Sequence, residues 1–239
     1  MKLIGLSLIA LLSLTACHAE PGPPDQQEQM QAPAQHEDTV ALPEVRLKGE
    51  KTVETALFER RSIRNYTGES LELDEVAQLL WSAQGMTADW GGRTAPSAGA
   101  TYPLELHLVA GDVDGLDSGV YRYASRAHRL VKTLDGDIRE ELAAASLGQS
   151  SVREGAAVFV FSAVYERTTG RYGDRGVRYV HMEAGHAAQN IYLQAVALDL
   201  GTVAVGAFSD DAVKELLSMS HDEVPLYVIP VGKVDVGSG

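Results

Sequence analysis

The sequence predicts an α+β domain that runs from about residue 45 to 234. Residues 156–164 form an unbroken apolar run rich in β-branched and aromatic side chains, which is typical of a strand buried on both faces. Residues 183–200 carry apolar side chains at helical spacing, and shorter alternating runs predict further strands. Strands and helices do not alternate as regular βαβ units, which favours the α+β class. A chain of this size buries roughly 70% of its unfolded surface, enough for a core without disulfides.

The first half of the domain predicts two helices followed by three strands. Val53, Ala56 and Leu57 have helical spacing. The second helix starts at Asp74, a favoured N-cap residue type, and stops at Gly85. The predicted elements are helices over residues 52–60 and 74–84, a strand over 104–110 and a hairpin that pairs 120–123 with 129–132.

The second half predicts the longest helix and the buried strand. The elements are a helix over 137–147, the strand 156–164, the helix 183–200, a strand over 202–208, a short helix capped by Ser209 and a final strand over 225–231. Gly148 and Gly201 lie at the ends of the two longer helices, where Gly is common. The long helix has one apolar stripe, made of Ala187, Ala188, Ile191, Ala195 and Leu198.

The N-terminus has the pattern of an export signal. Residues 1–16 place one cation, Lys2, before a short apolar run that ends in small residues. Leu14-Thr15-Ala16-Cys17 resembles the bacterial lipobox, which implies cleavage before Cys17 and its lipidation; a buried helix with an incidental cysteine is the alternative. Residues 17–44 then form a Pro- and Gln-rich tether. Because His18 rather than Asp follows the cysteine, we expect an outer-membrane lipoprotein that faces the periplasm and contacts the membrane through lipid only.

Composition excludes several classes of function. The net charge of −13 argues against a nucleic-acid partner, because phosphates need cations. One cysteine builds neither an internal disulfide nor a Cys-rich metal site. The chain lacks G-x-G-x-x-G, the P-loop and G-x-S-x-G. His181, Glu183 and His186 do not share a helical face, so we predict no metal site.

Three stretches carry candidate chemistry. Residues 60–66 hold three arginines and a serine, which predict an anion site or a helix end stabilised by cations. Residues 95–103 are nearly all small, so they either approach a flat ligand closely or pack a tight loop. Residues 171–179 form an Arg- and Tyr-rich loop before the long helix, on which His186, Gln189 and Asn190 share one face.

In this order, the segments 60–64, 96–100, 183–190 and 225–233 resemble those of nitroreductase-family flavoproteins, in particular the SagB/ThcOx-type dehydrogenase branch. The resemblance covers residues 52–233 and implies a nitroreductase-like α+β fold. It further implies a central mixed or antiparallel sheet flanked by helices, and a homodimer with FMN at the subunit interface.

The resemblance also assigns residues to the cofactor. It implies that Arg60, Arg61, Ser62 and Arg64 contact the phosphate and ribityl chain, with Lys233 as a further phosphate contact. Pro96, Ser97, Ala98 and Gly99 of the partner subunit line the isoalloxazine ring. Val205, Gly206 and Ala207 approach the other side of the ring.

One position departs from the family pattern. Azoline-oxidising members carry a Lys-Tyr pair where this chain has Arg171-Tyr172. Arginine stays protonated and is a poor base, so azoline dehydrogenation is not expected. Tyr172 is the candidate proton donor, and Arg171 the group that orients an anionic substrate. We expect FMN-dependent dehydrogenation of a small molecule in the cell envelope, with reoxidation by oxygen or a quinone. The alternatives are an NAD(P)H-dependent nitro or quinone reductase and a non-enzymatic flavin-binding module.

Overall fold

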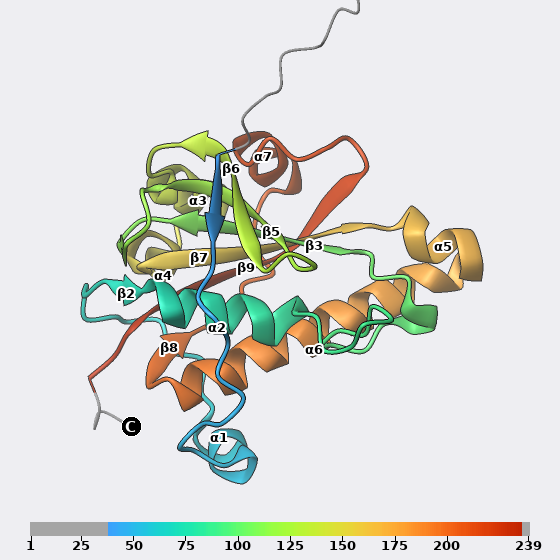
Figure 1. Ribbon diagram of the computed structural model, residues 1–239. Helices are drawn as coiled ribbons and strands as arrows, with labels where there is room; N and C mark the ends of the chain where they lie inside the picture. The colour runs from blue at the N-terminus through green and yellow to red at the C-terminus, as the bar shows by residue number, and fades with distance from the viewer. Residues whose placement is uncertain (1–37, 236–239) are drawn as a thin grey trace, which may run out of the picture. The chain divides into compact units, whose positions relative to one another are not determined.

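The computed structural model describes residues 38–235 (Figure 1). Within them, one seven-stranded sheet has the order β1-β6-β5-β3-β7-β9-β8, and each neighbouring pair is antiparallel. A separate parallel pair joins β2 and β4. The strands are β1 (Thr39–Ala41), β2 (Leu71–Glu72), β3 (Leu104–Ala110), β4 (Val113–Asp114), β5 (Gly119–Ala124), β6 (Arg129–Asp135), β7 (Ala157–Val164), β8 (Leu200–Thr202) and β9 (Glu223–Lys233). The domain is therefore α+β, as predicted, with an antiparallel main sheet.

Helices cover both faces of the sheet. They are α1 (Val53–Glu59), α2 (Leu73–Gln84), the short 3₁₀ turn η1 (Ala98–Ala100), α3 (Arg139–Ala145), α4 (Ser150–Glu154), α5 (Glu166–Tyr172), α6 (Arg175–Ala197) and α7 (Asp210–Leu216). In Figure 1, α2 and α6 lie against one face, while α3, α4 and α7 lie against the other. Each face has its own hydrophobic core.

The strand β7 separates these two cores. Every residue of β7 is buried, which confirms the predicted strand buried on both faces. Phe159 and Phe161 pack into the core beneath α2 and α6, whereas Val158 and Val160 face the other core. Successive side chains of a strand point to opposite faces, so a continuous apolar run is needed at this position.

Several predicted boundaries are confirmed and others are corrected. The hairpin of β5 and β6 forms, and the Ser209 side chain caps α7. The second helix starts at Leu73 and is capped by a reciprocal Glu72–Glu75 capping box instead of by Asp74. The predicted strand over 202–208 is shorter: β8 ends at Thr202, and Val205 makes a single bridge to Val228.

The long helix begins earlier than predicted. The segment 171–179 is no loop, because α5 ends at Tyr172 and α6 starts at Arg175. Only a two-residue break at Gly173, with φ 57°, separates them. Figure 1 shows α5 and the first turns of α6 extending beyond the sheet, where most positions are exposed. These turns therefore lack the apolar stripe from which a helix is predicted. At its other end, Gly201 lies in β8 and does not close the helix.

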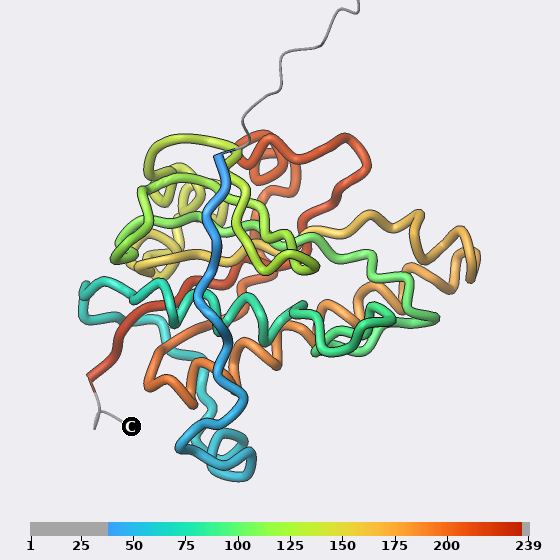
Figure 2. The backbone as a smooth tube through the Cα atoms, viewed as in Figure 1, coloured from blue at the N-terminus to red at the C-terminus, as the bar shows by residue number. Residues whose placement is uncertain are grey.

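The ordered domain also starts earlier than the predicted tether allows. Residues of β1 pair with β6, with Val40 opposite Leu130, so the stretch 39–44 is not all tether. Figure 2 follows the chain from β1 across α2 to α1. Gln78 of α2 holds this crossing segment by bonds to Arg46 N (2.9 Å) and Arg46 O (3.0 Å). Pairing with a sheet edge thus orders residues whose composition alone predicts no fold.

The predicted signal peptide and Cys17 lie outside the described residues. Across residues 38–235, no helix has both the length and the apolar character needed to cross a membrane.

Candidate functional site

The arginine segment lies at the end of α1, against the C-terminal half of α6. The Arg60 guanidinium stacks over the Tyr192 ring at 5.1 Å, and Ser62 Oγ lies 3.0 Å from Tyr192 Oη. Arg61 Nη1 donates to the carbonyls of Phe58 and Arg60, both at 2.9 Å. Arg61 therefore satisfies carbonyls at the end of α1, which is the helix-end role that the sequence left open.

Arg64 lies beside the end of β9. Its segment is fixed by Ile63 N, which donates to Thr202 O at 2.9 Å, and by Thr67 N, which donates to Lys233 O at 3.0 Å. Lys233 Nζ is paired with Glu75 Oε1 at 2.6 Å. Within residues 38–235, Arg60 and Arg64 form no ion pair, so their charge is available to an anion.

The segment 205–207 joins the arginines at this place. Ala204 N donates to Tyr192 Oη at 2.8 Å, so one tyrosine holds both segments. Val205 is buried and pairs with Val228, while Gly206 and Ala207 are exposed. A Cβ built on Gly206 meets only Tyr227, at 3.9 Å, which leaves open space over this backbone.

The small-residue loop lies elsewhere, against α5. Arg171 Nη1 donates to Gly99 O at 3.0 Å. A Cβ on Gly99 would lie 2.5 Å from Tyr172 Oη, and Gly99 has φ 61°. This left-handed backbone conformation favours glycine, and a side chain here would displace the ends of the Tyr172 and Arg171 side chains. The structure thus brings the candidate catalytic pair Arg171-Tyr172 to the predicted flavin loop.

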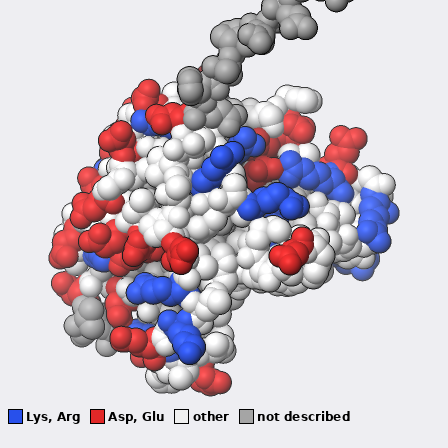
Figure 3. Space-filling view, in the orientation of Figure 1, with Lys and Arg blue, Asp and Glu red and all other residues white. Residues whose placement is uncertain are grey.

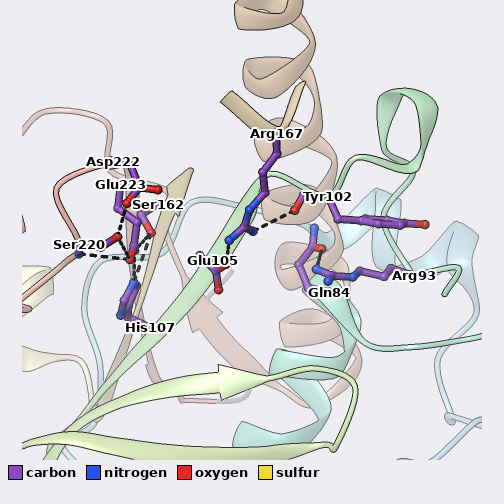
Figure 4. A network of polar contacts seen from close by, with 10 residues as sticks. All are labelled: Gln84, Arg93, Tyr102, Glu105, His107, Ser162, Arg167, Ser220, Asp222 and Glu223. Carbon is purple, nitrogen blue, oxygen red and sulfur yellow. Dashed lines mark hydrogen bonds and ion pairs between the residues drawn. The ribbon is translucent and has the colours of Figure 1, made fainter. Parts of the chain in front are cut away.

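A buried carboxyl group lies near this loop. Glu183 of α6 is 2% exposed, and burial raises its pKa to about 7, although the Ser97 hydroxyl, the Arg93 charge and the Gln84 amide favour the carboxylate. Glu183 Oε1, Gln84 Nε2 and Arg93 Nε are buried without hydrogen-bond partners among the described residues. Figure 4 shows Arg93 between Gln84, whose Oε1 it binds at 2.8 Å, and the Tyr102 ring.

The sequence did not indicate that Glu183 is a buried carboxyl group near the small-residue loop, since its spacing from His181 and His186 only argued against a metal site. The structure buries Glu183 on one side of α6, while His181 and His186 are exposed. His181 Nε2 instead lies 2.6 Å from Tyr165 Oη. No group of side chains within 38–235 is arranged to hold a metal ion.

The candidate residues therefore fall into two sets along α6. The first set lies around Tyr192 and the end of β9 and contains Arg60, Ser62, Arg64, Val205, Gly206 and Ala207. The second set, near Glu183, contains Pro96, Ser97, Ala98, Gly99, Arg171 and Tyr172. Since a helix rises about 1.5 Å per residue, Glu183 and Tyr192 are separated by about 14 Å along the axis.

Residues 57–233 match the Nitroreductase family. The chain belongs to the nitroreductase family. A protein of Methanocaldococcus jannaschii that carries the name nitroreductase is 46% identical over 194 residues, which cover 81% of this chain and 96% of that protein. The trifolitoxin operon protein TfxC of Rhizobium leguminosarum bv. trifolii is 26% identical, over 74% of this chain and 54% of TfxC.

Solved structures agree with this nitroreductase assignment. A crystal structure of an Anabaena variabilis protein named as a nitroreductase matches with a TM-score of 0.69 and 34% identity, over 77% of this chain and 38% of that one. The Escherichia coli microcin synthetase McbBCD complex contains a chain of the same fold, with a TM-score of 0.65 and 22% identity, over 88% of this chain and 79% of that one. The chain thus spans about half of TfxC and less than half of the Anabaena chain.

The residues of this nitroreductase-family site fit both a phosphate group and a flat ring system. Guanidinium groups bind phosphate oxygens bidentately, and Arg60 and Arg64 have no competing carboxylate among the described residues. The open backbone at Gly206 and the small side chains of Pro96–Gly99 leave room for a planar group.

Proposed function

We propose that this chain is an FMN-dependent oxidoreductase that works as a homodimer and dehydrogenates a small molecule in the cell envelope. The observation that carries the proposal is the division of the site along α6. Arg60 and Arg64, which form no ion pair among the described residues, lie at one place with the Gly206 backbone, and the small-residue loop with Arg171 and Tyr172 lies at another. A second copy can bring the two sets face to face across a bound flavin.

The exposed face of α1 supports the homodimer. Of the three residues that the sequence places at helical spacing, Val53, Ala56 and Leu57, only Ala56 is buried. Val53 is 65% exposed, Leu57 55% and Phe58 79%. These side chains form an apolar surface beside the arginine segment, and such surfaces mark protein contacts.

The chain's own residues divide the work. FMN, when bound, supplies the two-electron redox chemistry, and the protein supplies binding and orientation. Arg60 and Arg64 neutralise the phosphate, and Gly206 lets the backbone approach the ring. In dehydrogenation the substrate loses a hydride and a proton, and the Tyr172 hydroxyl, held against Gly99, would relay that proton to solvent; in the reductive alternative it would donate a proton to the product. Arg171 stays charged and holds an anionic group, so azoline oxidation by a lysine base is not proposed.

The envelope location rests on the N-terminal sequence pattern. Outside the cytoplasm NAD(P)H is not expected, so oxygen or a quinone is the proposed electron acceptor. NAD(P)H-dependent reduction of nitro compounds or quinones is the second candidate, favoured by the 46% identity to a protein named as a nitroreductase.

The test of the flavin assignment uses the full chain, purified with added FMN. We expect a yellow protein whose FMN affinity falls by at least tenfold in Arg64→Gln, about the value of a lost charge-assisted contact. Arg129→Gln, an exposed arginine on β6, is the matched control and should keep its affinity. A colourless, folded protein would refute the flavin assignment and leave a non-enzymatic module. Anaerobic addition of NADH then separates the two candidates, because only the reductase is bleached by it.

Light scattering tests the homodimer. Leu57→Glu places a charge on the α1 surface and should produce monomers. Leu147→Glu, an equally apolar exposed position (74%), should remain dimeric. A wild-type monomer with bound FMN would contradict the shared site.

A further inference from the structure

A continuous strip of arginine and tyrosine side chains leads away from the small-residue loop. Arg171 contacts Gly99 O and lies over the Tyr172 ring at 5.5 Å. The Tyr172 ring meets Tyr179 edge-on at 5.2 Å, and Arg175 lies over the Tyr179 ring at 5.9 Å. We call these four residues, Arg171, Tyr172, Tyr179 and Arg175, the Arg–Tyr strip.

The two guanidinium groups of the strip lack carboxylate partners among the described residues. Three other arginines of the chain have such partners: Arg139 pairs with Asp112 and Asp137, Arg153 with Glu140, and Arg167 with Glu105. Arg171 and Arg175 are exposed, and rings or a backbone carbonyl hold them instead.

The surrounding surface reinforces this charge. Figure 3 shows Lys and Arg side chains gathered at the end of the domain that α5 occupies. The neighbouring acidic residues Glu166 and Asp174 form no ion pair with the strip. In a chain with a net charge of −13, cations that acidic side chains leave unpaired are available to an external anion.

We propose that the Arg–Tyr strip binds the carboxylate of the substrate and the planar group that carries it. A guanidinium binds a carboxylate through two parallel hydrogen bonds. Tyrosine rings provide a rigid apolar surface for a planar group. This inference rests on the proposed function and deepens it: a substrate anchored at the strip has its remaining part directed along Arg171 and Tyr172 toward Gly99.

Fluorine NMR of para-fluorobenzoate, with the uncharged para-fluorobenzamide as its control, tests this proposal on the full chain. The readout does not depend on a flavin signal, so it is made with and without added FMN. We expect saturable binding of the benzoate and at least about tenfold weaker binding of the benzamide, because a charged contact is lost.

Three variants locate the binding. Arg171→Gln and Arg175→Gln should each weaken benzoate binding by about tenfold. Arg129→Gln removes the same charge from β6 and should change the benzoate affinity less than about twofold. Since Arg175 is exposed and lies over the half-buried Tyr179 ring, its variant keeps the test valid if Arg171→Gln does not fold.

The outcomes separate the two proposals. Equal binding of benzoate and benzamide, or equal losses in Arg129→Gln and Arg175→Gln, would overturn the substrate assignment even in a yellow protein. Strip-dependent benzoate binding in a protein that takes up no FMN would support the anion site and refute the flavin assignment.

Discussion

Two buried glutamates, Glu223 and Glu183, have opposite surroundings. Figure 4 shows Glu223 at the start of β9 within a cluster of polar side chains. Its Oε2 accepts from Ser162 Oγ at 2.6 Å and lies 2.9 Å from His107 Nε2, and its Oε1 accepts from Ser220 Oγ at 2.9 Å. Burial alone would raise the pKa of Glu223, but the hydrogen bonds from His107 and Ser162 outweigh it and lower the pKa to about 2.

Glu183 is buried more deeply and has fewer partners. Its Oε1 accepts no hydrogen bond from the described residues, and burial raises its pKa to about 7. Its neighbours Gln84 and Arg93 each have an unpartnered nitrogen as well.

The two clusters therefore differ in what they contribute to stability. The Glu223 cluster joins β3, β7 and β9 at the middle of the sheet, so its hydrogen bonds stabilise the fold. The Glu183 cluster has three buried polar atoms without partners among the described residues, whereas the Glu223 cluster has one, His107 Nδ1, and such atoms are unfavourable. Functional sites are where proteins keep such unfavourable buried groups, because the chemistry there uses an ionisable group with a shifted pKa. Glu183 lies beside the candidate flavin loop.

The largest expected effect is the loss of Glu223. Glu223→Ala leaves His107 and Ser162 without their partner, and we expect the free energy of unfolding at pH 7 to fall by about 4 kcal/mol. Urea denaturation measures this. Glu215→Ala, at an exposed position of α7, is the control and should change it by less than about 0.5 kcal/mol. A loss below about 1 kcal/mol would show that the cluster contributes little.

Glu183→Gln should instead stabilise the domain at alkaline pH. The folded pKa of about 7 lies above the value of 4.5 for an unfolded chain, so wild-type stability decreases as pH rises from 4.5 to 7. Above pH 7 the buried Glu183 carboxylate lowers the free energy of unfolding by on the order of 3 kcal/mol. The uncharged amide of the Gln variant removes this loss.

Thermal unfolding at pH 8 and pH 4.5 tests this difference. Glu183→Gln should unfold at a higher temperature than wild type at pH 8 and at the same temperature at pH 4.5. Glu69→Gln, which is exposed, should show no gain at either pH. A variant less stable than wild type at pH 8 would mean that Glu183 has a partner in solution.

Ser162→Ala removes one of the donors to Glu223. The remaining bonds from His107 and Ser220 keep the cluster partly satisfied, so a loss of about 1–2 kcal/mol is expected. The pKa of Glu223 should also rise, so that acid unfolding begins at a higher pH than in the wild type. Ser150→Ala on the exposed side of α4 serves as the comparison in the same acid titration; identical curves would contradict this role.

The smallest effect is expected at Ser97. Its hydroxyl favours the carboxylate of Glu183, and its Oγ accepts from Tyr102 N at 2.9 Å. Ser97→Ala should raise the pKa of Glu183 further above about 7 and cost about 1 kcal/mol of stability. Carbon-13 NMR titration of Glu183 measures the shift, and an unchanged or lowered pKa would refute the contact.

The sequence by itself determined the fold class, the buried strand β7, the hairpin and the order of the candidate segments. These features follow from local periodicity and from residue types at helix and strand ends, which are present in any short window of the chain. The resemblance to flavoproteins depended on the same kind of local pattern.

Only the tertiary structure decided which side chains meet. The carbonyl of Gly99 accepts a hydrogen bond from Arg171, which is 72 residues away in the sequence. The hydroxyls of Ser62 and Tyr192, 130 residues apart, are also hydrogen-bonded. It also showed that α1 exposes its apolar side chains, that β1 pairs with the sheet, and that Glu183 is buried with an oxygen unpartnered among the described residues. Burial and hydrogen-bond partners come from segments distant in sequence, so local composition cannot specify them.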